Sequence, residues 1–148
     1  MKSSNAHERI DQHIFIDHSD VLDTSIMLEI YRFMLRLRLI EERIATEYHP
    51  SDQMRCPVHL CIGQEAVPGA LSILVGTDDY LFSHHRSHGH YLAKGGDLKA
   101  MMAEIYGKAT GCSGGKGGSM HLIDLSVNIL GTTPIVGSII PIAVGAAF

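Results

Sequence analysis

A short segment, residues 83–90, contains four histidines and one arginine. Arg86 has a fixed positive charge and a planar fork of N–H donors that matches phosphate oxygens, and a neighbouring histidine can donate a further hydrogen bond. The segment directly follows a predicted strand, which is where α/β folds place ligand-binding loops. These residue types therefore predict an anion site at Arg86.

The residues alone leave two other interpretations open. The segment could be a solvated polar loop, or His84 and His88, four residues apart, could ligate a metal. A closed zinc site requires four ligands in a recognised spacing, which this segment lacks. Cys56, His59 and Cys61 also include metal-ligand types, but a half-site without a second pair does not complete a tetrahedral shell. Taken alone, His59 is more typical of a core histidine than of a catalytic one.

A glycine-rich segment, residues 107–118, has six glycines in twelve positions. Glycine loses the most backbone entropy on ordering, so this composition predicts a loop. Glycines let a backbone approach phosphate closely, and Lys116 adds positive charge. The segment is not a Walker A loop, because Gly117 follows the lysine where Ser or Thr is required. Taken alone, it is more typical of a flexible loop than of a nucleotide site.

The elements that would position these segments follow from the spacing of apolar residues. Residues 25–48 carry apolar side chains at helical intervals beside charged ones, which predicts a long amphipathic helix that ends at His49-Pro50. Residues 66–74 are small and apolar, which predicts a buried helix. Glu65, at the start of that helix, is expected to compensate the helix dipole.

Two further elements flank the histidine-rich segment. Residues 80–83, after a turn at residues 77–79, have the length and aromatic content of a short strand. Asp97 is typical of a helix N-cap, and apolar side chains follow it at helical spacing over residues 98–106. Gly107 is expected just past the end of this helix.

The two ends of the chain differ in composition. Residues 1–24 are polar with scattered charges, which predicts an arm that carries no chemistry. From residue 137 onward the chain is apolar with small side chains, which predicts a helix packed tightly against other backbone. An apolar helical run that stops at Phe148 lacks caps and a covering partner, so the sequence is expected to be truncated.

Composition and charge limit the class of protein. The chain has 148 residues, 45% hydrophobic and 19% charged, which suits one globular domain with a core. A net charge of -4 offers no electrostatic footprint for nucleic acid or for an anionic membrane. With no apolar stretch long enough for a bilayer and no secretory signal, a cytoplasmic protein is expected. The three cysteines are expected to be free thiols.

Four motifs, in order along the chain, resemble one family. Residues 59–66, HLCIGQEA, resemble a His-Leu-x-x-Gly-Gln-Glu-Ala element, and residues 85–89, HRSHG, resemble a Tyr-Arg-x-His-Gly element. Residues 115–121, GKGGSMH, and 135–147, IVGSIIPIAVGAA, resemble the family's glycine loop and a helix entry. Over residues 25–148 the chain resembles the alpha subunit of the thiamine-diphosphate-dependent dehydrogenase component of 2-oxo acid dehydrogenase complexes, the family of the pyruvate and acetoin dehydrogenases.

The resemblance implies a fold and a place for the cofactor. The implied fold is the α/β thiamine-diphosphate-binding fold, a mostly parallel sheet flanked by helices, of which residues 25–148 would form the N-terminal portion. The cofactor would lie at an interface between an alpha and a beta subunit of a heterotetramer. The beta subunit would supply the glutamate that activates the aminopyrimidine.

The resemblance also implies roles for individual residues. Arg86 would contact the diphosphate, and His85 beside it could donate to a phosphate oxygen. Ile135, Val136 and Gly137 would lie beside the aminopyrimidine through backbone and apolar contacts. The groups expected around the thiazolium and the substrate, as hydrogen-bond donors or proton-transfer groups, are His59, His88 and His121.

The chain departs from the family pattern at two positions and lacks one motif. His85 replaces a tyrosine, and Pro134 replaces a small residue ahead of Ile-Val-Gly, which suggests a branch outside the central pyruvate enzymes. The family's Gly-Asp-Gly and later Asn, which coordinate magnesium, are expected past Phe148. No residue of this chain is therefore assigned to the metal, and the fragment alone is expected to be inactive.

The implied activity is oxidative decarboxylation of a pyruvate-like 2-oxo acid, with transfer of the acyl group to a lipoyl group. The implied partners are the beta subunit, a lipoyl-bearing acyltransferase and the small 2-oxo acid. Two alternatives stay open. One is another thiamine-dependent enzyme, acyloin-forming or transketolase-like, and the other is a non-catalytic assembly module.

Overall fold

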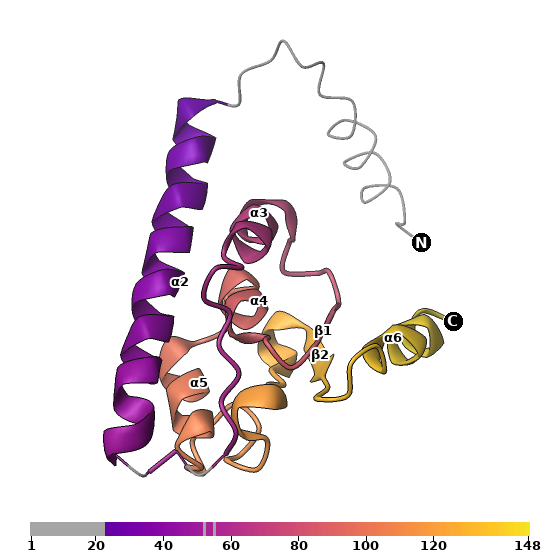
Figure 1. Ribbon diagram of the computed structural model, residues 1–148. Helices are drawn as coiled ribbons and strands as arrows, with labels where there is room; N and C mark the ends of the chain where they lie inside the picture. The colour runs from indigo at the N-terminus through magenta and orange to yellow at the C-terminus, as the bar shows by residue number, and fades with distance from the viewer. Residues whose placement is uncertain (1–22, 52, 55) are drawn as a thin grey trace.

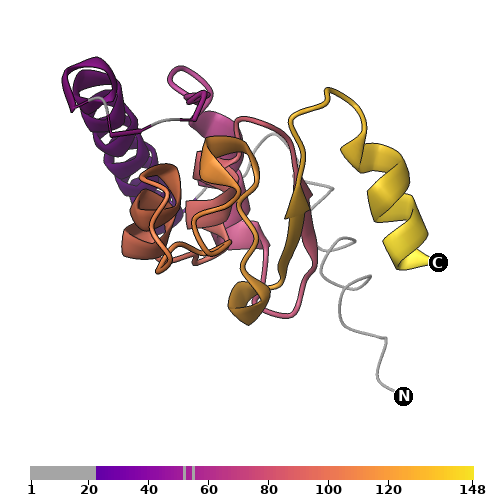
Figure 2. The ribbon, with the colours of Figure 1, turned by 90° about the horizontal axis from the view of Figure 1, so that it is seen from below.

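The computed structural model describes residues 23–51, 53–54 and 56–148. Helices α2 to α5 lie together on one side of a two-stranded parallel sheet, and helix α6 lies on the other side (Figure 1; Figure 2). The predicted polar arm, residues 1–24, falls almost wholly outside the described residues. Within the described part, no helix is long and apolar enough to cross a membrane.

Helix α2, Thr24–Ser51, is the long amphipathic helix that the sequence predicts. Leu37 and Ile44 lie on its buried face, each with 1% of its surface exposed. The helix continues past His49-Pro50, which was expected to end it. The difference is confined to the last residues of the helix, where a proline interrupts fewer hydrogen bonds than it would in the middle.

Helix α3, Ala66–Leu74, has the predicted bounds but is buried along only one edge. At Gly69 a Cβ atom would lie 2.8 Å from the Cγ atom of Met34 in α2, so the two helices approach closely there. Val67 and Leu74 are exposed instead. The prediction of a buried helix was therefore wrong for the outer face of α3. The main contacts of α3 are with α2 and α4, which cover its other side.

Helix α4, His88–Ala93, begins inside the histidine-rich segment. His88 and Tyr91 have no exposed surface, so the interpretation as a solvated polar loop was wrong for this half of the segment. Gly89 lets α4 approach its neighbours, because a Cβ atom there would lie within 3.0 Å of Pro68 and Leu37 side-chain atoms.

Strand β1, Leu81–Ser83, confirms the predicted strand and pairs in parallel with strand β2, Ile129–Thr132. Ser83 lies opposite Thr132 in the register. Strand β2 was not predicted, because four residues carry too little periodicity to identify a strand. Only its pairing with β1, far away in the sequence, and the burial of Ile129 define it.

Helix α5, Leu98–Ile105, is also confirmed. Asp97 caps it, since its carboxylate accepts hydrogen bonds from the backbone N–H groups of Lys99 and Ala100, each at 3.2 Å. Gly107, at φ +64°, ends this region as predicted. The glycine-rich loop follows, and two short 3-10 helices, η1 (Gly118–Met120) and η2 (Leu125–Val127), lead to β2.

Helix α6, Ile139–Ala147, forms where the sequence predicts a helix, but none of its residues is buried. At Gly145 no atom lies within 4 Å of the position that a Cβ would occupy, and Ile140 and Val144 are exposed. The prediction that this helix packs tightly against other backbone was wrong for the described residues. Within the described part, α6 contacts strand β1, and Ile139 and Ala143 are half-buried while its other residues are exposed.

Candidate functional site

The two parallel strands end side by side, and each leads into a segment singled out in the sequence. The backbone N–H of Thr133 donates to the carbonyl of Ser83 at 3.2 Å, which joins the two strand ends. From β1 the chain continues into residues 84–86, and from β2 into residues 135–137. Because α/β proteins bind ligands at the carboxyl ends of parallel strands, this edge is where a site is expected.

Arg86 lies at this edge and reaches back to the segment before α3. One of its guanidinium N–H groups donates to the carbonyl oxygen of Leu60. Its backbone N–H donates to Nδ1 of His84 at 3.1 Å, which turns the histidine-rich segment around the arginine. Beside them lies a pocket of about 330 Å³, lined by Cys61, Gly63, Gln64, Ala66, Val67, Pro68, His84, Arg86 and His90.

A larger groove of about 610 Å³ lies between α2 and α5. Its lining is mostly aliphatic, with three arginines and no histidine or carboxylate. Size alone would favour this groove, but general acid, base or metal chemistry requires groups that it lacks. The smaller pocket at the strand ends is therefore the candidate site.

Two histidines, His84 and His90, line the pocket, and the rings of His85 and His59 follow from His84 in a series of contacts. The ring centroids of His59 and His85 are 5.3 Å apart with perpendicular planes, and His84 lies 5.5 Å from His85 and 5.1 Å from His90. The Nδ1 atoms of His59 and His85 are buried and have no hydrogen-bond partner among the described residues. Since buried polar atoms are almost always paired, each of these two atoms is expected to have a partner other than the described residues.

Burial keeps two of these imidazoles uncharged. It lowers the pKa of His90 to about 4, with a smaller contribution from His84, and Nδ1 of His90 lies 2.6 Å from the hydroxyl of Ser83. Burial also lowers the pKa of His84, helped by the neighbouring charges of His85 and Arg86. At neutral pH the fixed positive charge of the pocket is therefore that of Arg86.

His88 lies in the interior instead of lining the pocket. Its side chain has no exposed surface, its Nδ1 is 2.7 Å from Oε1 of Glu41, and its Nε2 is 2.9 Å from the hydroxyl of Ser119. The same hydroxyl accepts a hydrogen bond from the backbone N–H of His59 at 3.1 Å. The structure thus joins His59 and His88, two of the predicted catalytic histidines, through Ser119.

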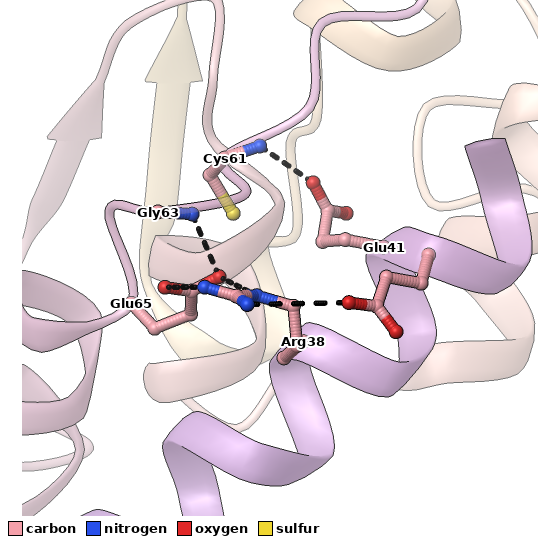
Figure 3. Close-up of polar contacts among 6 residues, drawn as sticks. Arg38, Glu41, Cys61, Gly63 and Glu65 are labelled. Carbon is pink, nitrogen blue, oxygen red and sulfur yellow. Dashed lines mark hydrogen bonds and ion pairs between the residues drawn. The ribbon is translucent and has the colours of Figure 1, made fainter.

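Two glutamates tie the segment before α3 to helix α2 (Figure 3). Glu41 accepts from the backbone N–H of Cys61 at 2.6 Å. Glu65 accepts from Nε and Nη2 of Arg38 at 2.6 and 3.0 Å, and from the backbone N–H of Gly63 at 2.9 Å. Glu65 is the N-cap residue of α3 but makes no side-chain cap hydrogen bond, so the arginine, and not the helix end, is its main partner.

These carboxylates affect the chemistry of their neighbours. Burial, together with the charge of Glu41, raises the pKa of the Cys61 thiol to about 12. That thiol therefore stays protonated at neutral pH and is a poor metal ligand or nucleophile. Among the described residues, no group of three His, Cys, Asp or Glu side chains could hold a metal ion, so the metal interpretations receive no support.

The glycine-rich loop wraps around a carboxylate of the protein itself. Glu104 of α5 has no exposed surface, and its oxygens accept hydrogen bonds from four backbone N–H groups of the loop at 2.6 to 3.2 Å. Gly111 is required for this packing, because a Cβ atom there would lie 2.3 Å from Oε2 of Glu104. The donors are the backbone N–H groups of Ser113, Gly115, Gly117 and Gly118.

The other predicted site residues, His121 and residues 135–137, lie outside the cluster formed by Arg86 and the histidines around it. His121 follows η1, and its carbonyl oxygen accepts from the hydroxyl of Ser113 at 2.7 Å, but no contact of its ring with the other candidate histidines is found in the described part. Ile135 and Val136 are exposed at the strand edge, and Gly137 has φ +82° in the turn that leads to α6. That turn is closed by Ser138, whose hydroxyl donates to the carbonyl of Ile135 at 2.8 Å.

Sequence reasoning missed three residues that organise the site, Glu41, Ser119 and Glu104. A signal was present for both glutamates, because each interrupts a buried apolar stripe. Glu41 falls between Leu37 and Ile44 on α2, and Glu104 lies among the buried residues of α5. A charged residue at an apolar position of a helix indicates a buried partner. Ser119 had no comparable signal.

Comparison with known proteins finds one family. The profile of the dehydrogenase E1 component family matches residues 31–148. The alpha subunit of acetoin:2,6-dichlorophenolindophenol oxidoreductase from Cupriavidus necator is 43% identical over 126 residues, which cover 85% of this chain and 38% of that protein. The protein of the same name from Bacillus subtilis is 44% identical over 120 residues, 81% of this chain and 36% of that protein.

A plant protein shows a similar likeness. The chloroplastic pyruvate dehydrogenase E1 component subunit alpha-3 from Oryza sativa subsp. japonica is 43% identical over 121 residues, 82% of this chain and 28% of that protein. The chain therefore spans less than two fifths of the length of these relatives.

Proposed function

The chain belongs to the dehydrogenase E1 component family, and from this membership we propose that residues 25–148 are the N-terminal portion of the thiamine-diphosphate-binding domain of an alpha subunit. The whole protein would oxidatively decarboxylate a pyruvate-like 2-oxo acid. The observation that carries the proposal is the meeting of residues 84–86 and 135–137 at the carboxyl ends of β1 and β2.

The residues at this edge fit a diphosphate cofactor. Arg86 offers a fixed charge with a donor fork. Among the described residues its guanidinium donates to the carbonyl of Leu60, which leaves other N–H groups for an anion. The Nδ1 atom of His85 is buried and has no hydrogen-bond partner in the described part, and the same holds for the Nδ1 atom of His59. We propose that Arg86 and His85 bind the diphosphate.

The remaining roles follow from the same placement. The exposed apolar pair Ile135 and Val136, with the turn at Gly137, would lie against the aminopyrimidine. His59 and His121 would lie toward the reacting end of the site, with His59 able to hold a proton or a hydrogen bond at Nδ1. His88 would contribute through its contacts with Glu41 and Ser119, because its enclosed ring has both nitrogens engaged.

The chemistry that thiamine diphosphate supplies when bound is an electron sink for cleavage next to a carbonyl. The chain would bind and orient that cofactor from one side. His84 and His90, uncharged at neutral pH, would add no positive charge there, so Arg86 would supply the charge that attracts the diphosphate. Magnesium requires oxygen ligands, and no group of three His, Cys, Asp or Glu side chains among the described residues could hold it, so none of these residues is proposed as its ligand. A beta subunit and a lipoyl-bearing acyltransferase are the proposed partners.

The test of the diphosphate site is Arg86→Ala in the full-length subunit assembled with its beta partner. Thiamine diphosphate affinity, measured by calorimetry with magnesium, is expected to weaken by about 2 kcal/mol, because a charge-assisted contact is lost. Arg43→Ala is the matched control, since Arg43 is exposed on α2 and pairs with Glu47 of the same helix. Equal affinities for wild type and Arg86→Ala would remove Arg86 from the site.

A second candidate substrate class is an acyloin. Two of the relatives are named for acetoin and a dye acceptor, and this favours an acyloin substrate for the present protein too. Dye reduction by the full assembly with a series of 2-oxo acids and acetoin would distinguish the two classes. Reduction with acetoin alone would overturn the 2-oxo acid proposal, and absence of cofactor binding by the intact assembly would favour the non-catalytic module.

A further inference from the structure

Three buried side chains from three elements form a continuous chain of hydrogen bonds. Glu41 of α2, His88 of α4 and Ser119 of η1 each have 0% of their surface exposed. Nδ1 of His88 lies 2.7 Å from Oε1 of Glu41, and Nε2 of His88 lies 2.9 Å from the hydroxyl of Ser119. Both ring nitrogens of His88 are therefore engaged inside the protein, away from the pocket.

Hydrogen positions follow from the partners. Glu41 accepts from the backbone N–H of Cys61 at one oxygen, and its other oxygen lies beside Nδ1 of His88. Because an ionised carboxylate can only accept, an ionised Glu41 requires the hydrogen on Nδ1 of His88. Ser119 accepts from the backbone N–H of His59. A neutral ring with the hydrogen on Nδ1 has an acceptor at Nε2, and the Ser119 hydroxyl lies within reach of that acceptor. His88 is thereby held in one tautomer.

The two ends of this hydrogen-bonded series, Glu41 and Ser119, both bind the segment of residues 59–61. The backbone N–H of His59 is held by Ser119 at 3.1 Å, and the backbone N–H of Cys61 is held by Glu41 at 2.6 Å. Between them, the carbonyl of Leu60 accepts the hydrogen bond from the guanidinium of Arg86. The direction of that carbonyl is fixed from both sides, and with it the position of the arginine.

We infer that Glu41 is a positioning residue, which acts through His88 and Ser119 to hold residues 59–61 so that the Leu60 carbonyl orients Arg86 at the pocket. The placement of residues 59–61 stands on the contacts alone. The consequence for ligand binding rests on the proposed diphosphate role of Arg86.

Burial of the Glu41 carboxylate costs desolvation free energy, which an apolar side chain at the same position would not cost. Replacing buried ionic groups with apolar ones of similar volume is often neutral or stabilising, whereas leaving one partner unpaired is strongly destabilising. Glu42, the next residue on α2, is 54% exposed and only reaches Arg38 at 4.0 Å. The two neighbouring glutamates thus provide a matched pair that differs in burial and in contact with residues 59–61.

The first measurement is amide hydrogen exchange in the full-length subunit assembled with its beta partner, without cofactor. Glu41→Gln is expected to speed exchange at the amides of His59 and Cys61 by about tenfold or more, because their local opening loses its restraint. Glu42→Gln should leave these rates unchanged. Unchanged exchange in Glu41→Gln would overturn the inference, whatever the protein binds.

The second measurement is a double-mutant cycle on thiamine diphosphate affinity with Glu41→Gln and Arg86→Ala. If Glu41 acts through Arg86, the Glu41→Gln variant raises the dissociation constant by about tenfold, and it adds little when Arg86 is already alanine. A merely structural role would give additive effects, which would refute the inference. Failure of the wild-type assembly to bind the cofactor would refute the proposed function while leaving the exchange result to decide the placement.

Glu41→Gln could prevent folding, so Ser119→Ala is the second variant. It removes the acceptor of the His59 N–H and the donor to His88 but leaves no charge unpaired. Faster exchange at His59, with native exchange at Tyr91 of α4, would support the inference. Native exchange at both amides would contradict it.

Discussion

At the scale of single residues, glutamates with little exposed surface organise the site. Glu41 and Glu104 are fully buried and accept hydrogen bonds from backbone N–H groups of segments later in the chain. Glu65 has 6% of its side chain exposed and pairs with Arg38 of α2. In each case a carboxylate holds irregular backbone in one conformation, because several N–H donors converge on two oxygens.

Glu65 provides a prediction on pH. The hydrogen bond from Arg38 is the main reason that the pKa of Glu65 is lowered from 4.5 to about 2. A lowered folded-state pKa contributes stability that is present above pH 4.5 and is lost as the pH falls toward 2. In Arg38→Ala the pKa of Glu65 should rise to its ordinary value or above, and acid unfolding should begin at higher pH.

Carboxyl carbon shifts across a pH titration, with urea unfolding at each pH, measure both effects. Arg36→Ala on the same helix is the control, since no ion pair of Arg36 with Glu65 is present in the described part. A Glu65 pKa that stays near 2 in Arg38→Ala would show that backbone hydrogen bonds alone hold the carboxylate ionised.

At the scale of elements, the site is built where helices meet irregular segments. Helix α5 carries the carboxylate that folds the glycine-rich loop, and that loop leads directly to η1 and Ser119. Glycines permit this loop conformation. At Gly115, which has φ +75°, a Cβ atom would also lie 2.5 Å from the carbonyl oxygen of Lys108. The loop therefore has an ordered structural role in the free chain.

Glu104→Gln is expected to destabilise the protein by about 3 kcal/mol, because a neutral amide turns donor hydrogens toward backbone N–H groups that need acceptors. Urea unfolding of the full-length protein measures the change. Glu29→Gln, at an exposed position of α2, should have almost no effect. A loss below about 0.5 kcal/mol for Glu104→Gln would mean that the loop finds other acceptors or water.

At the scale of the whole molecule, one half is well packed and the other is open. The core gathers residues from α2, α4, α5, β2 and the segment around Cys61. Helix α6 lies across the sheet from the other helices (Figure 2). Large apolar side chains of this helix and of the turn before it are exposed, among them Ile135, Val136, Ile140 and Val144. Several exposed apolar side chains on one helix and the turn before it favour association.

The 148-residue chain is therefore expected to self-associate as its concentration rises, through the surface of α6. Val144→Lys should reduce the association, as measured by sedimentation velocity, because it places a charge within the apolar side chains of the helix. Ala109→Lys adds the same charge at an exposed position of the glycine-rich loop and should not reduce it. Equal association of both variants would exclude α6 as the contact surface.

The amino-acid sequence by itself determined several elements through local chemistry. The spacing of apolar residues predicted α2 and α5, and Asp97 marked the start of α5, because a helix repeats every 3.6 residues and its cap lies next to it in the chain. The same locality let short ordered motifs such as HRSHG indicate the family. The predicted roles of the individual site residues stay predictions.

Tertiary structure alone decided how those motifs meet. Strand β2 exists through its pairing with β1, and His88 is enclosed because α4 packs onto α2, where Glu41 lies at an otherwise apolar position. The glycine-rich loop, which resembles a phosphate loop in composition, surrounds Glu104 instead. These outcomes depend on contacts between residues far apart in sequence, whose free energy arises only when the chain is folded, so no local pattern could specify them.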